Sequence, residues 1–389
     1  MKKIVALFLV IGMLLCLFAG CRGDKDPGSG TTPPESDTKP DSPEQTDSGS
    51  DTVDYSKMKV GLLLTNVVVD GGWCQAQAEG LKRAAAELGM TDDQLVMIES
   101  LSEGGSEADS TIVQLIDDGC NLIIGGSSGF VTNINGLCAQ YPDVYFAQFE
   151  GDTSDNCCSF SCRDIEAIFM CGYAAALMSD VDQLGYVAPN PQTSVVRGIN
   201  AFAAGAKAAR PNATVQIAWV NSWYDPAIEK ECANSLLQSG IKCLGYNGSS
   251  TAVCQAAQEA GGYCTGYNID MHDYAPEAVL TSFCWNWAPQ FKEIITQIAS
   301  DKWDNSPKYA GIEEGAAALS DWNTEIMPAD VIEKCNAMYE DILNGKYVVM
   351  GGPLSDRDGN ELLADGETFT TEELIDCYWL LDNVIGTLP

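Results

Sequence analysis

Short apolar segments alternate with amphipathic stretches along most of the chain from residue 59 onward. Apolar runs such as KVGLLLT (59–65) and QLGYVAP (183–189) are followed by stretches with helical periodicity, at 75–88 and 195–209. Short continuous apolar runs are typical of strands that are buried on both faces of a parallel sheet. The pattern therefore predicts an α/β protein whose helices cover both faces of parallel sheets.

The alternation falls into two series in tandem. The first begins at residue 59 and ends with a long helix candidate at 165–178, and the second runs from 183 to YCTGYNI (263–269). Two such series indicate two doubly wound lobes, and the roughly 335 residues after residue 56 are enough for two separate cores. Since ligands of open α/β sheets bind beyond the carboxyl ends of the strands, the residues after each strand are candidates for a binding site.

Those strand-end positions are rich in aromatic and polar residues. Trp73 in the first series and Trp223 in the second each lie near an Asp and small residues, and we expect the two indole rings to clamp a flat ligand. The alternative for either Trp is that it only fills the interface between the lobes. The other strand-end candidates are Asn66, Asp70, Ser127, Ser128, Phe130, Asn221, Ser222, Asp225, Asp270, His272, Trp285 and Trp287.

The first 20 residues have the pattern of a secretory signal. Two lysines precede an apolar run, Ile4–Gly20, which is shorter than the about 20 residues that a membrane-spanning helix needs. The small residues before Cys21 resemble the lipobox of bacterial lipoproteins, although Phe18 stands where that pattern prefers Leu. The resemblance implies a signal peptide at 1–20 and a lipid-modified Cys21. The alternative is an uncleaved anchor helix, and in both cases the rest of the chain works outside the cytoplasm at the cell membrane.

Residues 21–56 are predicted to form a disordered acidic tether. They consist mainly of Pro, Gly, Ser, Thr, Asp and Glu, with almost no large apolar residue, so they cannot bury enough surface to offset the entropy lost on ordering. A flexible chain of about 33 residues has a typical end-to-end distance of ~30 Å. We therefore expect this segment to give the folded part its reach from the lipid anchor.

The charge composition excludes several classes of partner. The chain has 55 acidic and 21 basic residues and a formal net charge of −34, which repels nucleic acid and anionic lipid.

Because the chain contains no GxxxxGK(S/T) motif and no second long apolar span, an ATPase and a permease would be separate chains. His272 is the only histidine, so a Ser–His or Cys–His nucleophile is hard to build. We expect no enzyme activity and no cofactor.

Sixteen cysteines raise the question of disulfides and metals. Most of those after residue 56 lie in apolar or helical runs, where a buried thiol serves as a small hydrophobic group. We expect mainly free thiols, and disulfides are the alternative for an exported chain. Cys157, Cys158 and Cys162 form the densest group, but no second pair with zinc-finger spacing occurs and the histidine is distant in sequence. We therefore expect no metal site.

Seven segments, in order, resemble the basic membrane protein family of substrate-binding lipoproteins. They are DGGWCQAQAEGL (70–81), GGSSGF (125–130), CGYAAALMS (171–179), the run 184–215, NSWYDP (221–226), TGYNID (265–270) and VLTSFCWNW (279–287). The resemblance covers about residues 57–355 and implies a type I periplasmic-binding-protein fold, in which two lobes joined by three crossings close on a ligand. The N-terminal lobe would comprise 57–182 and about 283–310, and the C-terminal lobe 183–282 and about 311–389.

The best-known members of that family bind purine nucleosides for an ABC importer, and the resemblance assigns roles by position. Asp70 and Trp73 fall on the Asp and the base-stacking aromatic of the first motif, whereas Cys74 falls on a family Asn. A thiol is a weak hydrogen-bonding group, so Cys74 changes one contact to the base. Trp223 falls on the second stacking aromatic.

Two further positions complete the implied site. Asp270 falls on the Asp that binds the ribose hydroxyls, and Trp285 stands where many members have a Lys. We therefore expect a flat, neutral ligand, with a purine nucleoside as the first choice, that a monomer delivers to ABC permease and ATPase subunits. The alternative is a sensory or adhesion module of the same fold, for a nucleoside, sugar or other ring compound, that is not coupled to transport.

Overall fold

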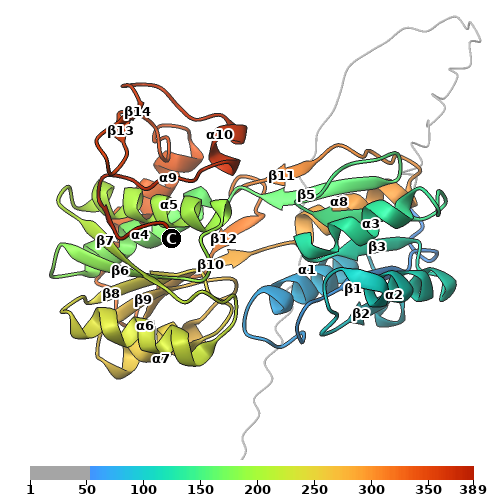
Figure 1. Cartoon of the computed structure of the whole chain (residues 1–389), viewed down its shortest axis with the longest axis horizontal. Helices are drawn as coiled ribbons and strands as arrows, with labels where there is room; N and C mark the ends of the chain where they lie inside the picture. Colours follow the sequence, from blue (N-terminus) through green and yellow to red (C-terminus); the bar gives the residue numbers. More distant parts are fainter. Residues whose placement is uncertain (1–52) are drawn as a thin grey trace, which may run out of the picture. The chain divides into compact units, whose positions relative to one another are not determined.

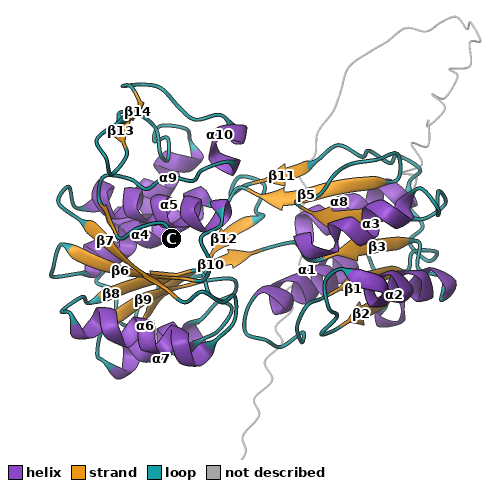
Figure 2. Cartoon of the chain, viewed as in Figure 1, coloured by secondary structure: helices purple, strands orange, loops and turns teal. Residues whose placement is uncertain are grey.

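The computed structural model describes residues 53–389, which contain two large sheets (Figure 1). The predicted signal peptide, the lipidation site Cys21 and most of the tether lie outside the described residues. Within the described part of the chain, no helix is long and apolar enough to cross a membrane. The predicted α/β class with two lobes is confirmed, since helices cover a mostly parallel sheet in each lobe (Figure 2).

The first sheet has six parallel strands in the order β11-β5-β4-β3-β1-β2. Successive residues of its strands face opposite sides, so Leu62 packs in a core with α1 and α8 while Leu63 packs in a second core with α2 and α3. The strands are β1 (Val60–Leu63), β2 (Leu95–Ile98), β3 (Leu122–Gly125), β4 (Tyr145–Phe149), β5 (Cys157–Cys162) and β11 (Lys308–Ala310). The helices are α1 (Trp73–Glu87), α2 (Gly105–Asp117), α3 (Val131–Cys138) and α8 (Ala288–Ala299).

The second sheet has seven strands in the order β12-β10-β9-β8-β6-β7-β15, and only β12 runs antiparallel to its neighbour. Its strands are β6 (Gln183–Ala188), β7 (Thr214–Trp219), β8 (Cys243–Tyr246), β9 (Tyr263–Gly266), β10 (Val279–Trp285), β12 (Ala317–Leu319) and β15 (Val384–Ile385). The helices are α4 (Ile165–Met178), α5 (Thr193–Ala209), α6 (Pro226–Gln238), α7 (Ala252–Glu259) and α9 (Ala329–Leu343). The chain also forms a small hairpin, β13 (Leu354–Ser355) and β14 (Glu361–Leu363), and the short helix α10 (Thr371–Ile375).

The chain passes between the lobes three times, after β5, after β10 and after β11. Arg163 lies at the first crossing, where it forms ion pairs with Glu166 at the start of α4 and with Glu313 at the third crossing. The lobe boundaries at residue 182 and at about 283 and 310 stay a prediction. Helix α4, which precedes the first of these boundaries, packs on α5 and on β8, β9 and β10.

Helices α4 and α5 approach each other closely through two glycines. A Cβ at Gly172 would overlap the carbonyl oxygen of Phe202, and a Cβ at Gly205 would overlap the carbonyl oxygen of Phe169. The remaining positions of α4 are apolar nearly all round and mostly buried, as expected for a helix covered on several sides. This tight pair holds α5 in place, and α5 carries a residue of the site described next.

Candidate ligand-binding site

A cavity of about 500 Å³ lies between loops that follow strands of both sheets. Of the residues predicted for a binding site, Asn66, Asp70, Trp73, Cys74, Ser127, Ser128, Trp223 and Trp285 line it. They come from both lobes, as the rule of carboxyl strand ends predicts. Whether they contact a ligand stays a prediction, but the structure brings them to one place.

Seven of the strand-end candidates do not line this cavity: Phe130, Asn221, Ser222, Asp225, Asp270, His272 and Trp287. Phe130 is fully buried in the core between the first sheet and helices α2 and α3. Asp270 is exposed, and its Oδ1 accepts a hydrogen bond from the backbone N–H of His272 at 3.0 Å. Tyr267 and Asn268 line the cavity instead, because they directly follow β9 whereas Asp270 lies further along the loop.

Asp70 organises the start of α1. Its carboxylate accepts hydrogen bonds from the backbone N–H groups of Gly72, Cys74 and Gln75 at 2.8, 3.2 and 3.1 Å. A carboxylate at this position satisfies the free N–H groups of the first helical turn and complements the helix dipole. These hydrogen bonds fix the first turn of α1, which begins with Trp73. Asp70 thus supports the position of Trp73 in addition to lining the cavity.

The ring of Trp73 is fixed on several sides. Its Nε1 donates to the backbone oxygen of Gly126 at 2.7 Å, and its ring lies edge-on to Phe149, Trp285 and Trp287 with centroid distances of 4.9, 5.4 and 5.5 Å. By contrast, the Trp223 side chain on the second lobe is 46% exposed. One aromatic wall is thus pre-formed, and the other lies at the solvent edge of the cavity.

A buried ion pair, which was not predicted from the sequence, lies in the cavity wall. Arg197 of α5 donates from Nε to Oδ1 of Asp164 at 3.2 Å, and the two side chains are 4% and 3% exposed. Burial by itself would lower the pKa of Arg197, but the negative charge of Asp164 raises it above its usual value. The arginine therefore stays charged, and a basic residue amid the apolar face of α5 was the sequence signal for it.

Two acceptors lie beside this ion pair. Glu150, at the end of β4, has a positive φ of 50° and lines the cavity. The cavity walls desolvate its carboxyl group and raise its pKa although the side chain stays open to solvent, while the charge of Arg197 opposes that rise. Asn247 is 4% exposed, and its Oδ1 has no hydrogen-bond partner among the described residues. Oε1 of Glu150 accepts a hydrogen bond from Oγ of Ser161 at 3.2 Å, and Oδ1 of Asn247 is itself buried, so the second carboxylate oxygen of Glu150 is the acceptor that the cavity offers to a ligand.

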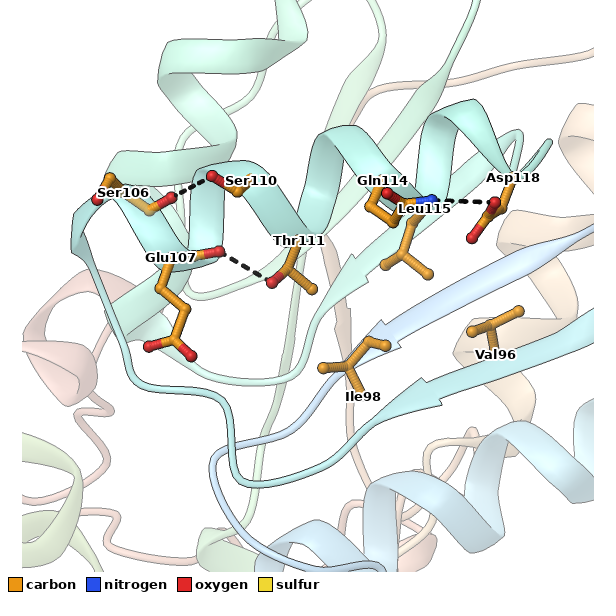
Figure 3. Close-up of a pocket in the computed structure, with 9 residues that line it drawn as sticks. All are labelled: Val96, Ile98, Ser106, Glu107, Ser110, Thr111, Gln114, Leu115 and Asp118. Carbon is orange, nitrogen blue, oxygen red and sulfur yellow. Dashed lines mark hydrogen bonds between the residues drawn. The ribbon is translucent and has the colours of Figure 1, made fainter.

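A second cavity, of about 490 Å³, lies beside the edge strand β2 and helix α2 (Figure 3). Two of its hydroxyl groups are engaged within α2, since Ser110 donates to the backbone oxygen of Ser106 at 2.7 Å and Thr111 to that of Glu107 at 2.9 Å. Residues of only the first lobe line it. It therefore lacks the two-lobe lining of the first cavity.

Most of the cysteines are buried and contribute to the packing of the protein interior. The fourteen cysteines of the described residues are free thiols, and all except Cys232 and Cys284 are buried. Burial raises the pKa of the thiol of Cys158 to about 12 and that of Cys243 to about 12. Thiols with such pKa values stay protonated at neutral pH and act as small apolar groups.

Solved structures of similar fold are ABC transporter solute-binding proteins and related two-lobe proteins. A solute-binding protein of Conexibacter woesei superposes with a TM-score of 0.63 at 20% identity, covering 75% of this chain and 98% of that one. A solute-binding protein of Aeropyrum pernix gives a TM-score of 0.62 at 16% identity, covering 75% and 93%. At these identities the likeness establishes the fold, and the predicted type I periplasmic-binding-protein fold is confirmed.

Sequence relatives agree with the predicted family. A purine-binding protein of Brucella abortus is 29% identical over 334 residues, which are 86% of this chain and 94% of that protein. A putative ABC transporter glucose-binding protein of Haloferax volcanii is 29% identical over 259 residues, 66% of each chain. The family model described as ABC transporter substrate-binding protein PnrA-like matches residues 57–350. The chain therefore belongs to the PnrA-like family of ABC transporter substrate-binding proteins.

Proposed function

We propose that the protein captures a purine nucleoside in the cavity between its lobes and delivers it to an ABC permease. The observation that carries this proposal is that Trp73 of the first lobe and Trp223 of the second line the same cavity. A flat ring that stacks on both would draw the lobes together, and a ligand that contacts both lobes stabilises the closed form. The protein would act as a monomer, and lipid modification of Cys21 would hold it at the outer face of the cytoplasmic membrane.

The charges around the cavity favour a neutral ligand. The lining contains the carboxylates of Asp70, Glu103, Glu150 and Asp164 but a single guanidinium, Arg197, which is paired with Asp164. A phosphate group would meet net negative charge there, whereas hydroxyl and N–H donors would meet acceptors. Since Asp270 lies outside the cavity, we assign the sugar hydroxyls to the carboxylate of Glu150, which lines it.

A sugar is the second candidate ligand, because the relative named as a putative glucose-binding protein is 29% identical over 259 residues. Sugar rings also stack on tryptophan and donate hydroxyl groups to carboxylates. Sensing without transport is the second candidate role. Loss of radiolabelled ligand uptake on deletion of the gene would support transport, and unchanged uptake would favour sensing.

Thermal unfolding of residues 22–389 tests the ligand. The protein is refolded first to remove any ligand carried through purification, and it is then heated with guanosine, inosine, adenosine, free purine bases or glucose. A ligand present at 1,000 times its dissociation constant stabilises the native state by about 4 kcal/mol. A higher melting temperature with a nucleoside supports the proposal. A shift with glucose alone would replace the nucleoside with a sugar, and no shift with any of these ligands would refute both.

A further inference from the structure

Two short loops from opposite lobes meet backbone to backbone at the edge of the cavity. Residues 70–72 precede α1 in the first lobe, and residues 248–251 follow β8 in the second. A Cβ at Gly72 would lie 2.9 Å from the carbonyl oxygen of Ser249 and 3.0 Å from its Cα. Gly71 and Gly72 are both buried although they belong to a loop. The opposite lobe therefore covers them, and Gly72 leaves no room for a side chain.

The first-lobe loop is held rigidly by its own lobe. Asp70 accepts the N–H of Gly72 at 2.8 Å, and Oε1 of Gln75 accepts the N–H of Gly71 at 3.1 Å. Gly71 has a φ of +74°, a conformation that side chains disfavour, and a Cβ there would lie 3.5 Å from Cγ2 of Thr251. The loop is thus fixed in shape by its own hydrogen bonds before the second lobe contacts it.

The second-lobe loop is held just as firmly. Ser250 donates from Oγ to Oε2 of the buried Glu229 at 2.6 Å, and Asn268 donates from Nδ2 to the backbone oxygen of Gly248 at 3.0 Å. The atoms that face Gly72 are the backbone atoms of Ser249, which cannot rotate away as the end of a long side chain would. A methyl group on Gly72 could therefore be accommodated only by a wider gap between the lobes.

We propose that Gly72 and the 248–251 loop form a closure stop, which sets how closely the two lobes approach. Gly72 is followed directly by Trp73, and Ser249 itself lines the cavity, so the stop lies at the edge of the ligand space. Gly72 is then a positioning residue: its bare backbone lets Trp73 and the second-lobe lining reach the ligand together. For its effect on ligand retention this inference rests on the proposed function, whereas the lobe separation does not depend on it.

A graded pair of variants, Gly72→Ala and Gly72→Leu, tests the stop in residues 22–389. We expect the ligand dissociation rate to rise about tenfold for Ala and more for Leu, because dissociation rates carry most affinity differences within one binding surface. Gly136→Ala and Gly136→Leu are the controls, since Gly136 lies exposed on α3 with no atom within 4 Å of its Cβ position. They should retain the wild-type dissociation rate.

Small-angle scattering supplies a readout that needs no ligand. Gly72→Leu should show a larger radius of gyration than the wild type and Gly136→Leu, with the thermal unfolding of the ligand-free protein as the check on folding. If Gly72→Leu does not fold, Thr251→Trp introduces the same wedge from the second lobe and should give the same two changes. Wild-type dissociation rates together with a wild-type radius would overturn the closure stop. If no ligand binds the wild type, the proposed function fails, and the radius alone then decides for or against the stop.

Discussion

Replacing Arg197 with Met should strongly destabilise the protein, because it leaves the carboxylate of Asp164 buried without its partner. The Nε–Oδ1 distance is 3.2 Å, and the two side chains are 4% and 3% exposed. Removing one member of such a buried pair typically costs about 3–5 kcal/mol, because the remaining charge is desolvated and uncompensated. That is a large share of the roughly 5–15 kcal/mol by which a folded domain is stable.

The assay is urea unfolding, followed by tryptophan fluorescence, of Arg197→Met, Asp164→Leu and the double variant. The double variant should recover much of the loss, since an apolar pair of similar size avoids the unpaired charge. Lys207→Met is the matched control on the same helix: Lys207 and Asp382 are 2.7 Å apart, but their side chains are 42% and 44% exposed. Such a surface pair contributes about 0–1 kcal/mol. A loss below about 1 kcal/mol for Arg197→Met would refute the reasoning.

Three further predictions follow from the site and its supports. Trp73→Ala and Trp223→Ala should each weaken ligand binding by about 1–3 kcal/mol in calorimetry, and unchanged affinity in both would exclude the clamp. Gly205→Ala should lower the free energy of unfolding by about 1–3 kcal/mol through overpacking against α4, whereas an effect as small as that of Gly136→Ala would contradict this packing. Burial raises the pKa of Glu229, so the wild type should lose stability relative to Glu229→Gln as the pH rises above about 4.5, through that raised pKa. Urea unfolding at a series of pH values measures the difference, and a pH-independent difference would show that Glu229 titrates normally.

The strand-end rule depends only on the order of strands along the chain, and seven of the residues that it singled out line one cavity. Apolar runs mark the strands, and the carboxyl ends of parallel strands meet at one edge of each sheet. Trp73 in the first lobe and Trp223 in the second could therefore each be expected at a strand-end site without coordinates. The same rule does not say how the loop turns after the strand. Phe130 and Asp270 therefore lie outside the cavity lining: Phe130 is buried in the core, and Asp270 is exposed on the loop after β9.

The polar part of the cavity could not be predicted because it depends on pairings between distant residues. Arg197 reads as one basic residue in a helix until Asp164, 33 positions earlier, is seen to neutralise it. Likewise, Gly72 has the local appearance of a helix start, and only the approach of the second lobe gives it a further constraint. Sequence periodicity reports the burial of each element, whereas these contacts depend on how two elements are placed relative to each other.

The C-terminal segment helps to position α5, although it lies outside the cavity lining. The family match ends at residue 350, yet Asn200 of α5 donates to the backbone oxygen of Trp379 at 2.7 Å and accepts the N–H of Leu381 at 3.0 Å. Strand β15 then adds an edge to the second sheet beside β7. Helix α5 is thus fixed by α4 on one side and by the C-terminal segment on another, three residues from Arg197. The position of the cavity's single cationic group therefore depends on chain that contributes no residue to the cavity lining.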